Sequence, residues 1–239
     1  MTGLLNRVLD THGGLARWRQ VGQIEATIVT GGKLWDIKGQ PQDATPRRMT
    51  AATRREWASL HPFGAADQKT DFTAGRIAIE KLDGAVVAER LDPRQSFAGH
   101  ALTTPWDPLQ RAYFNGYALW TYLNSPFLTA LPGVTADEVE VDDEQRGRLR
   151  GLRVHFPAAL ATHSQVQEFY FDDDCSLCRH DYRVDIAGGF AAIQHISDMV
   201  EVDGIMLPTK RRAYRCDRDG RVLPEELMVS IDLSDYRLS

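Results

Sequence analysis

Most of the chain alternates hydrophobic and polar residues with a period of two, which is typical of β-strands that bury one face. Short runs of this kind are separated by glycine-rich or acidic turns. Together these runs predict roughly eleven strands. The alternating runs cover residues 23–30, 33–38, 48–60, 76–82, 86–91, 138–141, 149–156, 164–171, 178–186, 191–200, 205–216 and 229–236.

Two regions have a helical period instead. Residues 4–20 place apolar side chains three and four positions apart, interrupted by a pair of glycines. In the middle of the chain Asp107 can cap a helix that has Pro108 at its first position, and large apolar side chains continue over 109–123. So many aromatic residues in one helix require a broad surface to cover. We therefore predict that this helix forms a lid over the sheet.

The order of the elements indicates the fold class. Asp83-Gly84 and Asp203-Gly204 lie between alternating runs, and such turns favour tight hairpins because glycine tolerates a positive φ. Helices are grouped and do not alternate with strands, which disfavours a parallel α/β fold. The sequence predicts a mainly β (α+β) protein, with a curved antiparallel sheet covered by helices on its concave face. No linker or repeat divides residues 1–239, so we expect one domain.

Alternation also predicts which side chains face the interior. In 178–186 one face carries Arg179 and Asp181, predicted to face solvent, and the other carries Cys178, His180 and Tyr182 among apolar residues. In the run 191–200 a second histidine, His195, shares a face with apolar neighbours. Apolar walls with a few polar groups are typical of a ligand cavity, although buried histidine and tyrosine also occur in filled cores.

We take eight residues as candidates for ligand binding. They come from the central helix and from strand faces predicted to point inward. They are Tyr113, Tyr117, Trp120, Gln167, Phe169, Tyr182, His195 and Arg211.

Composition restricts the partners. A net charge of -5 and short, balanced basic runs disfavour nucleic-acid binding. No apolar stretch is long enough for an integral membrane helix, and the first residues lack a secretory leader pattern. We therefore expect a cytoplasmic protein. The sequence leaves its oligomeric state open.

Two metal hypotheses rank low. The pair Cys175 and Cys178 has the spacing of a zinc or redox site, but it falls at a hairpin and has few partners to complete a site. His163, His180 and His195 fall on neighbouring predicted strands, yet no H-x-H pair fixes two ligands on one element. Nucleotide-binding and serine-nucleophile motifs are missing as well. We expect no metal and no cofactor.

Acid–base catalysis is the alternative to simple binding. A histidine in an apolar pocket can transfer protons near neutral pH, so His180 and His195, with Tyr182 nearby, are the catalytic candidates of an enzyme. Such an enzyme would isomerise, cyclise or hydrolyse a hydrophobic metabolite. A third role, interaction only, would need an exposed apolar patch.

Three motifs in the C-terminal half carry a family resemblance. Phe169-Tyr-Phe-Asp172, Leu177-Cys-Arg-His-Asp-Tyr182 and Val202-Asp-Gly-Ile-Met-Leu-Pro208 occur in succession. This series resembles the LolA/LolB/LppX-like lipoprotein-carrier superfamily over about residues 135–236. The resemblance implies an antiparallel half-barrel of about eleven strands, closed by helices, that holds an acyl chain or another hydrophobic ligand. It implies no catalytic residue. Binding of a hydrophobic small molecule is therefore the first functional hypothesis.

Overall fold

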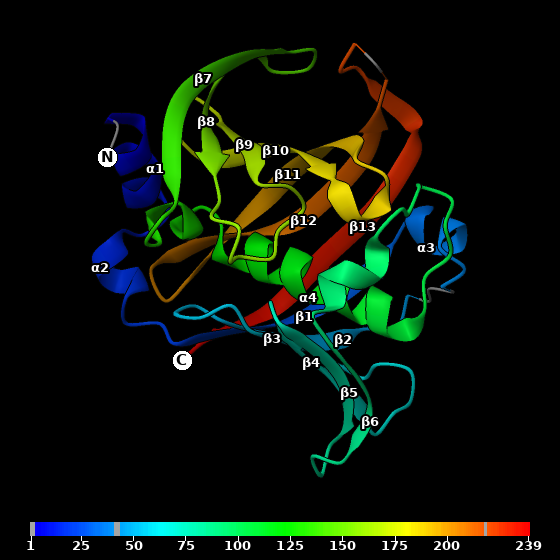
Figure 1. Ribbon diagram of the computed structural model, residues 1–239. Helices are drawn as coiled ribbons and strands as arrows, with labels where there is room; N and C mark the ends of the chain where they lie inside the picture. Colours follow the sequence, from blue (N-terminus) through cyan, green and yellow to red (C-terminus); the bar gives the residue numbers. More distant parts are fainter. Residues whose placement is uncertain (1–2, 41–43, 218) are drawn as a thin grey trace.

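A computed structural model describes residues 3–40, 44–217 and 219–239. It contains a curved antiparallel half-barrel sheet (Figure 1) with strands in the order β6-β5-β4-β3-β2-β1-β13-β12-β11-β10-β9-β8-β7. The strands are β1 Gln23–Gly31, β2 Arg47–Ala52, β3 Ala58–His61, β4 Gln68–Thr73, β5 Arg76–Lys81, β6 Val86–Leu91, β7 Thr135–Asp143, β8 Gly147–His155, β9 Val166–Phe171, β10 Leu177–Val184, β11 Phe190–Val202, β12 Ile205–Cys216 and β13 Val222–Leu238. The predicted fold class is confirmed.

The sheet consists of two runs of hairpins that meet at one pair of strands. β1 to β6 form one run and β7 to β13 the other, and β1 pairs with β13 from Ile24 opposite Leu238 to Gly31 opposite Ser230. Every strand pairing is antiparallel, as the hairpin signals predicted. The two halves therefore share one continuous hydrogen-bonded surface.

Helices occupy both regions where the sequence predicted them, and short helical segments are present elsewhere as well. The helices are α1 Gly3–Thr11, α2 Leu15–Trp18, α3 Leu34–Ile37 and α4 Pro108–Asn124, with the 3-10 turns η1 Pro93–Phe97, η2 Phe127–Ala130 and η3 Asp185–Ala187. α4 crosses the concave face in the centre of Figure 1, and α1 and α2 lie beside one end of the half-barrel. Among the described helices none is long and apolar enough to cross a membrane.

α4 begins as predicted because its capping groups are complete. The Asp107 carboxylate accepts the N–H of Gln110 at 2.8 Å, and the Gln110 side chain accepts the N–H of Asp107 at 2.9 Å. Pro108 occupies the first position, where a missing N–H has no effect on the helix. Nearly every residue from Gln110 to Asn124 is buried, so this helix is enclosed on several sides.

Three local predictions were wrong. Residues 33–38 contain α3 and not a strand, since the adjacent Leu34 and Trp35 are both buried, which a helical turn allows and alternation does not. The run 48–60 is divided into β2 and β3, and β4 was missed because it buries only Thr70 and Phe72. The sheet consequently has thirteen strands, against about eleven expected.

Gly116 fixes how closely α4 approaches the sheet. A Cβ atom at this position would overlap the ring of Phe72 on β4. We expect Gly116→Ala to lower the free energy of unfolding by about 1–2 kcal/mol, because overpacking outweighs the better helix propensity of alanine. Gly3→Ala on α1 is the control, since a Cβ there meets nothing within 4 Å. Urea denaturation of both variants provides the measurement, and an unchanged midpoint for Gly116→Ala would show that α4 can shift freely.

Candidate functional site

The concave face of the sheet and α4 enclose a group of polar side chains that hydrogen-bond to one another. Its central residue is His163, on the loop between β8 and β9. The Tyr122 hydroxyl lies 2.7 Å from His163 Nε2 and 3.0 Å from the Tyr182 hydroxyl. The Tyr117 hydroxyl lies 3.3 Å from His163 Nδ1, and the His163 ring stacks on Tyr182 with centroids 4.1 Å apart. All four side chains are buried.

Burial keeps the interior histidines neutral. Desolvation, with the charge of Arg94, lowers the pKa of His163 to about 3. His180 stacks on Phe169 at 4.1 Å, and its Nε2 lies 2.7 Å from the Gln167 side-chain oxygen. Desolvation, helped by the nearby charge of Arg211, places the pKa of His180 well below its ordinary value. His180 Nδ1 is buried and has no hydrogen-bond partner among the described residues.

Arg211 on β12 brings a charge into this interior. Its side chain is 1% exposed. One amino group donates to the Gln194 side-chain oxygen and the other to the Tyr122 carbonyl, each at 2.8 Å. The Tyr122 carbonyl needs such a donor, because the residue four positions further along is Pro126, which lacks an N–H. Arg211 therefore caps the C-terminal end of α4.

No carboxylate balances the Arg211 charge within the described part of the chain, where no ion pair joins it. Its guanidinium lies over the Tyr122 ring at 4.8 Å, and its Nε is buried without a hydrogen-bond acceptor. Burial lowers the pKa of Arg211 to about 10, so the group stays cationic at neutral pH. An unbalanced buried charge costs on the order of several kcal/mol.

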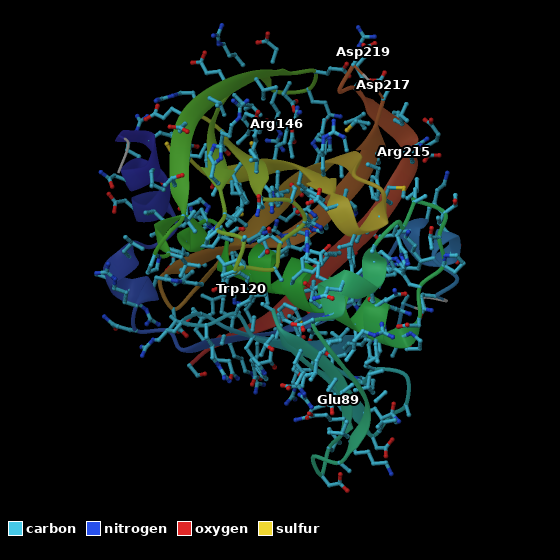
Figure 2. The ribbon with its side chains drawn as sticks, viewed as in Figure 1. Glu89, Trp120, Arg146, Arg215, Asp217 and Asp219 are labelled. Atoms are coloured by element: carbon cyan, nitrogen blue, oxygen red, sulfur yellow. The ribbon has the colours of Figure 1, made fainter. Side chains whose placement is uncertain are left out.

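Most of the predicted ligand-binding residues face this interior. Tyr113, Tyr117, Trp120 and Phe169 are buried in the main apolar core, and Tyr182, Gln167 and Arg211 belong to the polar group or contact it. Trp120, which Figure 2 labels, lies on α4 and donates its indole N–H to the carbonyls of Ala52 and Arg55. The ligand-binding role of these residues stays a prediction.

His195 lies on the opposite face of the sheet, contrary to its predicted inward position. In the β10–β11 pair Arg179 is opposite His195, while His180 is opposite Gln194. Since side chains alternate between faces, His195 cannot share a space with His180. Cys178 is also displaced outward, because a bulge between Leu177 and Arg179 shifts the register of β10. An acid–base pair of His180 and His195 is therefore not assembled in this structure.

The outer face carries a cleft of about 750 Å³. It lies between the tips of the β7–β8 and β12–β13 hairpins, which Figure 2 marks with Arg146 on one side and Asp217 and Asp219 on the other. Its lining includes Asp143, Tyr170, Arg179, Asp181, Ile193 and His195. Desolvation lowers the pKa of His195, which favours a neutral ring.

A buried ion network forms one wall of this cleft. Arg179 was predicted to face solvent but its side chain is 9% exposed. It donates to both oxygens of Asp181, at 2.8 and 2.7 Å, and to Asp143 at 2.9 Å. Asp143 also accepts the backbone N–H groups of Gln145 and Arg146, which fixes the β7–β8 turn. The network therefore ties the hairpin tip to β10.

His163 and His180 both pack against Tyr122 and Tyr182, whereas His195 lies on the other face of the sheet. Among the described residues no three His, Cys, Asp or Glu side chains form a group suited to a metal ion. Cys175, Cys178 and Cys216 are free thiols. Burial raises the pKa of Cys178 and that of Cys216 to about 11, which disfavours the reactive thiolate.

Sequence reasoning missed Glu56 altogether and considered His163 only as a possible metal ligand, without its central place in this polar group. His163 precedes β9 in an irregular segment, so no strand alternation could assign it a face. Glu56 lies in the turn between β2 and β3, where its carboxylate accepts the N–H of Ala161 at 3.0 Å. Desolvation raises the pKa of Glu56 to about 8, against the effects of that hydrogen bond and of Arg94. Both residues come from turns, and only the folded chain places them over α4.

Solved structures of low sequence identity share this architecture. A LolA superfamily protein from Nitrosomonas europaea superposes with a TM-score of 0.51 at 13% identity, covering 98% of this chain and 92% of that one. A DUF1329 family protein from Desulfovibrio piger gives 0.52 at 13% identity, covering 100% and 94%. An outer membrane lipoprotein-sorting protein domain from Vibrio parahaemolyticus gives 0.51 at 8% identity, covering 99% and 91%. No family model and no curated protein matches the sequence.

Proposed function

Because the chain has the half-barrel fold of LolA superfamily proteins, we propose that it binds a hydrophobic small molecule or lipid-like ligand between the curved sheet and α4. The solved structures supply the fold only, and one of them is described as a lipoprotein-sorting domain. That description is consistent with a lipid-like ligand here. The other support for the proposal comes from the interior of this chain.

The observation that carries the proposal is a set of unpaired polar atoms inside an apolar enclosure. Thr121 Oγ1, His180 Nδ1 and Arg211 Nε are buried and have no hydrogen-bond partner among the described residues. In a core that serves packing alone, buried polar groups are almost always paired. The three atoms belong to α4, β10 and β12, whose buried apolar residues are part of the main hydrophobic core. Such an arrangement suits an apolar ligand with a polar end.

Entry of a ligand requires α4 to move. Its side chains are buried against the concave face, so a ligand of any size must displace some of them. The segments on either side of α4 are irregular or short 3-10 turns, η1 before it and η2 after it. We therefore propose that α4 acts as a movable cover. Gly116, which lets it approach β4 closely, sets the tightness of that cover.

Quenching of Trp120 tests the proposal. A long-chain alcohol with two bromine atoms is neutral and quenches tryptophan only at short range. We expect it to bind with saturation and to quench the fluorescence of the wild-type protein. Trp120→Phe should remove most of the quenchable signal, because Trp120 is buried on α4. Trp57→Phe is the control, since Trp57 is only partly buried and donates to Asp71.

Two results would contradict the proposal. One is the absence of saturable quenching in the wild-type protein. The other is quenching that remains unchanged in Trp120→Phe, which would place the ligand elsewhere, for example in the outer cleft.

A further inference from the structure

We infer that the ligand of the interior is an amphiphile whose anionic head group pairs with Arg211. This inference rests on the proposed function and adds the chemical class of the ligand. The arginines of β10 and β12 differ in whether a carboxylate pairs with them. Arg212, the next residue, points to the other face and pairs with Asp232 at 2.6 Å. Arg179 is also deeply buried, and two carboxylates contact it. Arg211 is the more buried of the two and has none.

The partners that Arg211 does have are neutral oxygens. The Tyr122 carbonyl lies at the C-terminal end of α4, where the helix dipole supplies only a partial negative charge. The Gln194 oxygen is an amide oxygen. Together they satisfy hydrogen bonds but leave the net charge in place. A carboxylate or phosphate would supply the missing negative charge and accept hydrogen bonds from the same N–H groups of Arg211.

The geometry of the guanidinium favours an acceptor with two oxygens. Nε and the amino group that donates to Tyr122 lie on one edge of the planar group, and only the amino group is in use. Arginine pairs most strongly with a carboxylate or a phosphate through two parallel hydrogen bonds. Movement of α4 withdraws the Tyr122 carbonyl from this edge. The head group then replaces it and satisfies Nε at the same time.

Nearby polar groups suit such a head group. The Tyr122 ring lies under Arg211, and its hydroxyl contacts that of Tyr182. Gln194 links Arg211 to the Tyr182 hydroxyl, at 2.8 and 3.5 Å. His180 packs beside both tyrosines and has an unpaired Nδ1. No carboxylate takes part in these contacts. The apolar residues around this group would surround the alkyl chain of the ligand.

A series of probes with one chain length and three head groups tests the inference. Dodecanoate, 1-dodecanol and dodecylammonium are titrated into the wild-type protein below their micellar concentrations, with calorimetry as the readout. We expect dodecanoate to bind roughly tenfold or more tightly than the alcohol, and dodecylammonium to bind most weakly. Arg211→Gln should remove the preference for dodecanoate. Arg212→Gln, on the same strand but the other face, should keep it.

The outcomes separate the two proposals. If dodecanoate and dodecanol bind equally, the inference about the head group is wrong and the proposed function stands. If none of the three binds, the proposed function itself fails. If Arg211→Gln does not fold, the order of the three affinities in the wild-type protein still decides, since a preference for the cation or the alcohol contradicts the inference.

Discussion

Arg179→Ala is expected to lower the free energy of unfolding by about 3–5 kcal/mol. The reason is the environment that the substitution leaves behind. Asp143 and Asp181 lose their common partner while remaining largely buried, with side-chain exposures of 3% and 19%. Two like charges then face each other in a poorly solvated space. Urea denaturation at pH 7, followed by far-UV circular dichroism, measures the loss.

The loss of stability in Arg179→Ala should depend on pH and on the burial of the two carboxylates. Desolvation raises the pKa of Asp181, and only Arg179 and its hydrogen bonds oppose that effect. Without Arg179 the pKa should rise further, so Arg179→Ala should regain part of its stability as the pH falls and Asp181 is protonated. Arg153→Ala is the matched control, since its pair with Glu168 is half exposed and should contribute at most about 1 kcal/mol. Equal effects of the two substitutions would show that the buried network has no special role.

The wild-type protein is expected to lose stability between about pH 5 and pH 8, and Glu56→Gln should remove most of that loss. Desolvation raises the pKa of Glu56 from 4.5 to about 8 in the folded protein. In the unfolded chain the carboxyl ionises near its ordinary pKa, so over this window the unfolded state binds fewer protons than the folded state. The contribution of Glu56 to the free energy of unfolding is therefore fully present at low pH and is lost as the pH rises through the pKa of the folded state.

The size of the Glu56 effect is on the order of a few kcal/mol. Glutamine keeps an oxygen for the N–H of Ala161 but cannot ionise, so the variant should exceed the wild type in stability at pH 8 and above. Denaturation curves at pH 5, 6.5, 8 and 9 measure the change. Glu201→Gln is the control because Glu201 is exposed on β11. If the wild type and Glu56→Gln show the same pH profile, Glu56 is solvated or paired in solution.

Elements defined by local chemistry could be predicted from the sequence. α4 was predicted because Asp107 and Pro108 act on their immediate neighbours, and the structure adds Gln110 to the same cap. The β5–β6 hairpin was predicted because Asp83-Gly84 specifies a tight turn. In both cases the interactions that fix the element lie within a few residues of one another.

Long-range effects explain the predictions that were wrong. The bulge at Cys178 inserts one residue into β10, so alternation assigned Cys178 to the wrong face, although it placed His180 and Tyr182 correctly. His195 shares its face of β11 with Ile193, but Ile193 lines the outer cleft and not the interior. The central position of His163 depends on two tyrosines from α4 and one from β10. Nothing in the residues around His163 indicates that these partners will meet there.

The pairing of β1 with β13 has a consequence for how the molecule assembles. Ile24 is opposite Leu238 in this pair, so β13 must be synthesised before this junction can close. Until then β1 has an unpaired edge, whereas α4 is already available to cover the apolar face of β2 to β5. Closure of the half-barrel should therefore be a late step in folding, after the hairpins of each half have formed.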